Sequence, residues 1–296
     1  MLQNFLRLVR NSENKSLTTL AFVLVILFIL ACKCGDLGNT NRSNSNNGNN
    51  SNSGKTSATE PDNGDFKVVN VPVKNPKYES LDKYVKDKRM LENAADDLNK
   101  NLTLPWDITI ASKDCDGTIN AYYNPQDRSI TICYEFMELF QKLYLDQGKS
   151  PDEANQLMFD ATTFIFCHEL GHGLIDAYKL PVTGKEEDAV DQLATYISAE
   201  EMGEQGENAA QAGALGFYYL SEKRQLDDTA FADEHSMDKQ RFYNIICWLY
   251  GHNPERYGNV VQNGTLPAAR AQRCSEEYEK LSNAWKTQLR PFRKNP

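Results

Sequence analysis

The chain has 296 residues, of which 40% are hydrophobic and 10% aromatic, so it can bury a sizeable core and is not disordered as a whole. Its formal net charge of -9 opposes nucleic-acid binding, because no basic surface is available to displace the counterions of a phosphate backbone. An uncharged or basic partner is easier to accept.

The first 31 residues have the layout of an export signal. Three basic residues precede an apolar run, from residue 17 to 31, that is short of the ~20 residues needed to span a bilayer, so a cleaved signal is favoured over a retained anchor. The run ends in Ile-Leu-Ala before Cys32, which resembles the lipobox of bacterial lipoproteins and implies a lipid on Cys32. An ordinary signal is the alternative. We expect a lipid-anchored protein of the bacterial cell envelope, periplasmic or surface-exposed, that meets the membrane through this lipid.

Residues 32–65 are dominated by Asn, Ser, Gly and Thr. Such a composition cannot bury enough apolar surface to offset the entropy of ordering, so we predict a flexible tether. Residues 66–296 contain neither a second linker nor an internal repeat, which predicts one domain in that range.

The pattern of the domain predicts a small sheet followed by helices, which is an α+β fold. A helix is expected over 78–101, and the long helix begins after Ser150-Pro151 and runs to about Tyr178, since Pro is favoured in a first turn. Strands joined as hairpins are expected at 106–111, 118–123 and 128–134. Further helices are expected at 187–202, 208–220, 237–250 and 274–289.

Five cysteines lie in this domain, and an exported chain meets conditions that allow disulfides. Cys115 and Cys133 flank a predicted hairpin, whereas Cys247 and Cys274 lie at the end of one predicted helix and the start of the next. We therefore predict these two pairs as disulfides. Cys167 is left over inside an apolar helical stretch, where a buried, inert thiol is expected.

The long helix contains the motif His168-Glu169-Leu-Gly-His172. Residues four apart lie on one face of a helix, so both imidazoles can hold one ion while Glu169 takes a proton from an attacking water. Imidazole nitrogens with a carboxylate oxygen suit zinc, and catalysis requires an open fourth position. The sequence thus predicts a zinc site with Glu169 as general base.

Two further features of this helix point to a site. Gly171 and Gly173 interrupt it, although each Gly costs about 1 kcal/mol relative to Ala, so another element is expected to approach closely. Asp176 lies near the end of the helix, where the helix dipole disfavours a carboxylate. We therefore expect Asp176 to have a partner near the site.

The third ligand is expected in the acidic segment that follows. If this segment is helical, Glu187 and Asp191 point the same way, with Glu187 on the metal and Asp191 accepting the outer N–H of a ligating imidazole, that of His168 first. Glu186 and Asp188 are alternatives to Glu187, and the acidic segment is otherwise a solvated helix start.

The HExxH helix followed by Glu187-x-x-x-Asp191 resembles the gluzincins, the thermolysin-like zinc peptidases, and its stretch to Asp176 is similar to their HELxHxxxD helix. Residues 114–134, 168–195, 231–236 and 240–248 are also similar to a bacterial family named as putative metallopeptidases, once catalogued as a domain of unknown function. This likeness spans nearly all of 66–289 and implies a zincin-like catalytic domain. The gap between His172 and Glu187 is shorter than in thermolysin, which leaves little room for the usual intervening substructure.

A zinc peptidase also needs a donor for the oxyanion that forms on the substrate. His235, Tyr243 and Tyr196 are candidates, and the acidic pair before His235 favours its protonated, donating form. By analogy with thermolysin-like enzymes we expect His235 first and Tyr243 second. The alternative for His235 is a surface histidine beside surface acids.

The predicted function is hydrolysis of a peptide or protein substrate. Two other functions stay open at this point: a non-catalytic envelope lipoprotein that binds a partner and uses the metal as a staple, and a zinc amidase acting on cell-wall peptides. The first does not need Glu169. Redox chemistry at iron also uses two His and one carboxylate, but the base of the HExxH motif argues against it.

Overall fold

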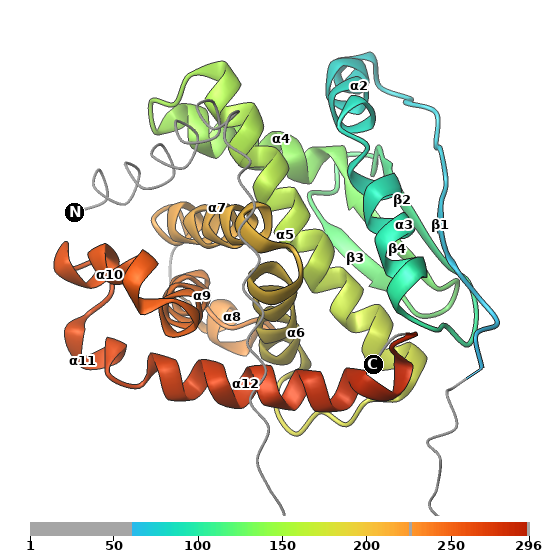
Figure 1. Cartoon of the computed structure of the whole chain (residues 1–296). Coiled ribbons are helices and arrows are strands. Elements are labelled where there is room, and N and C mark those ends of the chain that lie inside the picture. Colours follow the sequence, from blue (N-terminus) through green and yellow to red (C-terminus); the bar gives the residue numbers. More distant parts are fainter. Residues whose placement is uncertain (1–60, 225–226, 295–296) are drawn as a thin grey trace, which may run out of the picture.

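The computed structural model describes residues 61–224 and 227–294 (Figure 1). The predicted signal, the lipidated Cys32 and the tether up to residue 60 lie outside the described residues. Among the helices of the described ranges, none is long and apolar enough to cross a membrane. The fold is α+β, as predicted, with a small sheet on the N-terminal side of a mostly helical domain.

The sheet has four strands in the order β1-β2-β4-β3. The strands are β1 (Phe66–Val68), β2 (Ile108–Lys113), β3 (Ala121–Asn124) and β4 (Ser129–Cys133). β1 and β4 both pair with β2 in parallel, and only β3 and β4 form the antiparallel pair of a hairpin. The expectation that all predicted strands form hairpins was wrong for β2 and β3. Ile110 and Ile132 are fully buried in the two central strands, whereas β3 is only partly buried, which suits an edge.

The helix predicted over 78–101 is two helices, α2 (Glu79–Asp87) and α3 (Met90–Asn101), after a 3-10 turn (Pro76–Tyr78). Between them Arg89 has a φ of 52°, a left-handed conformation that ends the first helix. An additional helix that was not predicted, α4 (Tyr134–Asp146), follows β4 directly.

The long helix α5 (Pro151–Tyr178) has the predicted bounds and runs through the middle of the molecule (Figure 1). Ser150 and Glu153 form a capping box at its start, and Pro151 occupies the first turn. α5 packs against β3 and β4 on one side and against α6 and α7 on the other. It therefore lies between the sheet and the C-terminal helices.

The C-terminal half is helical, as predicted. α6 (Glu186–Tyr196) continues into a π-helical turn (Ile197–Glu201), and α7 (Gly203–Ser221), α9 (Asp238–His252) and α12 (Cys274–Leu289) match the other predicted helices. Shorter elements are α8 (Asp228–Ala232), α10 (Pro254–Gln262), α11 (Ala268–Ala271) and a final 3-10 turn (Arg290–Phe292). Buried side chains from the sheet and from these helices form one hydrophobic core.

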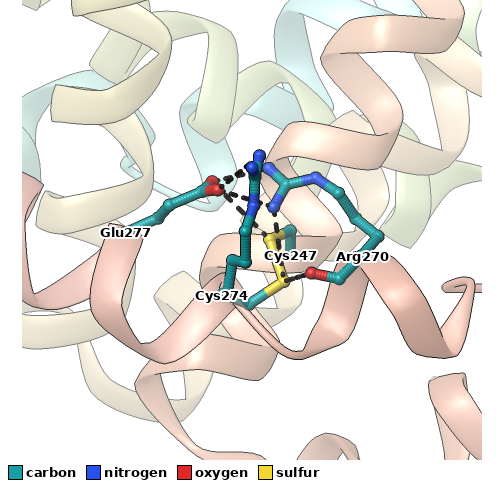
Figure 2. Close-up of a disulfide and its surroundings, with 5 residues drawn as sticks. Cys247, Arg270, Cys274 and Glu277 are labelled. Carbon is teal, nitrogen blue, oxygen red and sulfur yellow. Dashed lines mark hydrogen bonds and ion pairs between the residues drawn. A yellow bond between two sulfur atoms is a disulfide. The ribbon is translucent and has the colours of Figure 1, made fainter.

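Both predicted disulfides are formed, Cys115–Cys133 beside the sheet and Cys247–Cys274 between α9 and α12. Figure 2 shows the second one beneath an ion pair in which Arg270 Nη2 lies 2.6 Å from Glu277 Oε2. Cys167 is free and buried, and burial raises the pKa of its thiol to about 12. Its thiol is therefore inert at neutral pH, as predicted.

Candidate metal centre

The centre forms near a close contact between α5 and α6. A Cβ built on Gly171 would lie 2.8 Å from Val190 Cγ1, so position 171 must be glycine for α6 to reach this position. This is the close approach that the glycines predicted. A Cβ built on Gly173 would lie 3.5 Å from the ring of Tyr123, which is an ordinary van der Waals contact.

Three predicted ligands converge at this point. Glu187 Oε2 lies 3.1 Å from His168 Nε2, and Glu187 Oε1 lies 3.3 Å from His172 Nε2. Donors around a tetrahedral zinc ion with bonds near 2.0–2.1 Å are about 3.3 Å apart, so the spacing fits one zinc ion. Two imidazoles and a carboxylate are also the donor set that zinc takes in catalytic sites. The side chains fit the metal that the motif implies.

Each imidazole is oriented from behind by a carboxylate on α6. His168 Nδ1 lies 2.8 Å from Asp191 Oδ1, which is the contact that the sequence predicts. His172 Nδ1 lies 2.7 Å from Glu186 Oε1. Glu186, one alternative to Glu187, thus faces the outer nitrogen of the second imidazole. Such contacts fix the tautomer and the direction of a ligating ring.

The charges of the site reflect these contacts. Burial acts to raise the pKa of Glu187, but its hydrogen bonds to His168, His172 and His235 outweigh burial and hold that pKa far below its usual value. Burial acts to lower the pKa of His172, whereas its hydrogen bonds to Glu187 and Glu186 raise the pKa to about 9. Glu187 is therefore a carboxylate, as a metal ligand must be.

Glu169 lies beside the ligands and faces the edge strand. Its Oε2 accepts a hydrogen bond of 3.0 Å from the backbone N–H of Tyr123 on β3, and the residue is 7% exposed. The Tyr123 hydroxyl donates a hydrogen bond of 2.8 Å to Asp176 Oδ2, and Lys179 Nζ lies 2.8 Å from Asp176 Oδ1. The partner expected for Asp176 is thus Tyr123, whose backbone N–H also binds Glu169, and not one of the two histidines.

His235 reaches the centre from the loop before α9. Its Nε2 lies 3.0 Å from Glu187 Oε2, and its Nδ1 lies 3.0 Å from Asp233 Oδ1. The hydrogen bond to Glu187 is the main cause that raises the pKa of His235. Ser236 Oγ donates a hydrogen bond of 2.6 Å to Asp188 Oδ1, which anchors this loop on α6. Asp188, the other alternative to Glu187, is therefore engaged with this loop.

The two tyrosine candidates do not line the site. The Tyr196 hydroxyl donates a hydrogen bond to Glu201 Oε1 at 3.0 Å, and Tyr243 packs against Phe242 on α9. Neither belongs to the described side chains around the cavity at the centre. His235 is the only one of the three donor candidates that the described residues bring to this cavity.

The cavity above the ligands has a volume of about 700 Å³. It is bounded by β3, by the C-terminal half of α5, by the start of α6 and by the loop that carries His235. Residues 120–123 of the edge strand and its approach form one wall, opposite the two imidazoles. A cleft with an edge strand along it can accept an extended chain.

A comparison with protein families matches residues 70–289 to a family described as "Putative metallopeptidase". The chain belongs to this family. The match covers strands β2, β3 and β4 and helices α5, α6 and α9, and so it includes the elements that meet at the centre. No curated protein and no solved structure matches the chain significantly. A metal-dependent peptidase is the function that the family description names.

The sequence did not assign a role at the site to Arg241 or Tyr123, and it considered Glu186 only as an alternative ligand, not as the partner of His172 Nδ1. Arg241 Nη2 lies 2.7 Å from Asp191 Oδ1. Tyr123 acts through its backbone N–H, which no side-chain pattern reports, and Arg241 comes from a helix far along the chain. Glu186 belongs to the acidic start of α6, and which of these acidic side chains faces which imidazole depends on how α6 is rotated about its axis.

Proposed function

We propose that this chain is a zinc-dependent peptidase in which His168, His172 and Glu187 hold the metal and Glu169 is the general base. The observation that carries the proposal is the position of Glu169, between the ligands and an edge strand at the wall of an open cavity. A metal that only staples the fold has no use for such a carboxylate. The binding-only alternative is therefore the weaker one.

Zinc bound to these ligands would supply Lewis acidity, which lowers the pKa of water toward about 7 and polarises a substrate carbonyl. Glu169 takes the proton of the attacking water and passes it to the leaving amine. The hydrogen bond from Tyr123 N–H holds Glu169 Oε2, and Glu169 lines the cavity in which this transfer would occur. Transfer by a positioned side chain contributes roughly 10²- to 10⁴-fold in rate.

His235 is placed to stabilise the oxyanion that develops on the carbonyl. Its Nδ1 lies 3.0 Å from Asp233 Oδ1, and its Nε2 faces Glu187 at the centre. Lys185 Nζ donates a hydrogen bond of 3.1 Å to the Asp233 carbonyl oxygen, which ties this loop to the start of α6. The loop thus keeps the donor beside the ligands.

The substrate backbone is proposed to add to β3 as a further strand. Cys133 N–H donates to the Asn120 carbonyl oxygen at 3.1 Å, so alternation directs the backbone groups of Ala121 and Tyr123 away from β4. The outward N–H of Tyr123 is used by Glu169. The N–H and C=O of Ala121 and the C=O of Tyr123 are then the edge groups that face an extended peptide.

We also propose that the protein works outside the cytoplasm, attached by a lipid on Cys32. The two disulfides of the structure support an oxidising compartment. The mature N-terminus from bacterial membranes, determined by mass spectrometry, tests this proposal. A lipid-modified Cys32 is expected, and an unmodified mature chain that begins elsewhere would contradict it.

The peptidase proposal is tested with purified protein and a mixture of peptides, whose cleavage products are identified by mass spectrometry. Zinc-loaded protein is expected to cut internal peptide bonds, chelator-treated protein to lose this activity, and added zinc to restore it. Cell-wall peptides in the same mixture test the amidase alternative. If only these are cut, the substrate class proposed here is wrong while the metal centre stands.

A further inference from the structure

Arg241 on α9 is a buried arginine that reaches across to α6. It is 8% exposed, and its Nε and Nη2 each lie 2.7 Å from an oxygen of Asp191, Oδ2 and Oδ1 respectively. Its guanidinium lies over the ring of Phe217 on α7, 3.9 Å from the ring centroid. The planar fork of arginine therefore holds the carboxylate of Asp191 through two parallel hydrogen bonds.

The same carboxylate orients a metal ligand. Asp191 Oδ1, which accepts from Arg241 Nη2, also lies 2.8 Å from His168 Nδ1. A rotation of the Asp191 carboxylate that released His168 would therefore also break its hydrogen bonds to Arg241. The imidazole is then held with Nδ1 toward Asp191 and Nε2 toward the other ligands.

We propose that Arg241 is a positioning residue for the metal centre, which acts through Asp191 to fix the ring of His168 and so strengthens metal binding. The proposal rests on the metal site of the proposed function, but it does not require that the chain hydrolyse peptides. Carboxylates behind ligating histidines contribute 10- to 100-fold in metal affinity, and a residue that fixes such a carboxylate acts on the same quantity.

The carboxylate that orients the second imidazole is much more exposed than the one that orients His168. Glu186, which faces His172 Nδ1, has a side chain that is 48% exposed, whereas the side chain of Asp191 is 4% exposed. One ligand is therefore fixed from the buried interior, and the other is held from the surface. The loss of Arg241 should therefore disturb the orientation of His168 and not that of His172.

A purely structural role for Arg241, as an ion pair between α6 and α9, is the competing explanation. The chain offers a matched control: Arg256 Nε lies 2.9 Å from Glu207 Oε2, and the side chain of Glu207 is 6% exposed. This pair also joins an arginine to a buried carboxylate, but neither residue lines the cavity at the centre. Loss of Arg256 should thus perturb stability without reaching the ligands.

The test measures the zinc dissociation constant by competition with a chromophoric chelator for the whole folded protein. Arg241→Met is expected to weaken zinc binding 10- to 100-fold, as loss of an outer-shell partner does. Arg241→Lys should lose less, because lysine keeps the charge without the fork. Arg256→Met should leave zinc affinity unchanged. Equal zinc affinity in wild type and folded Arg241→Met, or equal losses in Arg241→Met and Arg256→Met, would overturn the proposal.

A double-mutant cycle with Asp191→Asn keeps the proposal testable if Arg241→Met alone folds poorly, because the Asn variant no longer buries an unpaired carboxylate. If Arg241 acts through Asp191, adding Arg241→Met to Asp191→Asn should cause no further loss of zinc affinity. Additive losses would overturn the proposal. Wild-type protein that binds no zinc would remove the proposed metal centre as well, which is a different result from zinc binding that is indifferent to Arg241.

Discussion

Gly171 on α5 and Val190 on α6 lie so close that a methyl group at position 171 would come within 2.8 Å of Val190 Cγ1. This contact sets the distance between the helix of the two imidazoles and the helix of Glu187. The two glycines of α5 differ in this respect. A Cβ at position 173 would lie 3.5 Å from the ring of Tyr123, so an alanine fits there without a clash.

We predict that Gly171→Ala weakens zinc binding and destabilises the fold, whereas Gly173→Ala does neither. Overpacking of a tight contact costs about 1–3 kcal/mol, and the gain in helix propensity of about 1 kcal/mol offsets only part of it. Gly173→Ala receives the same gain without the clash. Urea unfolding and zinc titration of both variants check this, and equal behaviour of the two would contradict the role given to Gly171.

Glu169→Gln is predicted to keep the fold and the zinc but to lose nearly all peptide hydrolysis. The amide retains the shape of the side chain and cannot take a proton from water, so a loss of roughly 10²- to 10⁴-fold in kcat is expected. The measurement compares the two proteins at matched zinc content, determined by elemental analysis. Similar turnover would show that Glu169 is not the base, and the binding-only function would then be preferred.

His235→Ala is predicted to lower kcat with little effect on KM or on zinc content. Removal of one oxyanion donor typically costs about 3 kcal/mol in activation free energy, and the loss falls on turnover when the donor acts only in the transition state. Tyr243→Phe is the control, because Tyr243 packs on α9 away from the cavity and its loss should change neither constant. Loss of zinc from His235→Ala would contradict a role confined to the transition state and would show that His235, which contacts Glu187, supports metal binding.

Zinc affinity is predicted to rise with pH between about 6 and 9. His172 has its pKa raised to about 9, so below that value its ring mostly carries a proton that zinc must displace, whereas above it the ring is mostly neutral. Each displaced proton weakens apparent binding up to about tenfold for every unit of falling pH. Chelator competition at several pH values checks the slope, with circular dichroism to show that the fold is intact throughout. A flat profile would contradict the contacts between His172 and the carboxylates of α6.

The convergence of His168, His172 and Glu187, the proposed ligands, could be predicted from the sequence because it depends on helix periodicity, which is local. His168 and His172 share a face in any helix, and Glu187 and Asp191 do the same one element later. The residues that orient these ligands were harder to predict from the sequence. Arg241 approaches Asp191 only after α9 has packed on α6, and no short-range pattern distinguishes it from a surface arginine.

The strands were located from the sequence, but their pairing was predicted incorrectly. Alternation predicts a strand but does not predict which strand pairs with it. β2 pairs in parallel with β4 as well as with β1, and the whole of β3 lies between β2 and β4 in the chain. The three-residue β1 is too short for any pattern. The break between α2 and α3 falls on Arg89, where no glycine signals a left-handed residue.

The ligands of the centre lie on two consecutive helices, and only the short connection 179–185 separates them. An ion that joins such neighbours closes a small loop, and closing a small loop removes little entropy from the unfolded chain. In addition, contacts of Glu187 with His168 and His172 already hold these three side chains together without a metal. Folding and metal loading can therefore be separate events, so a chain delivered unfolded to its destination can fold first and acquire its cation last.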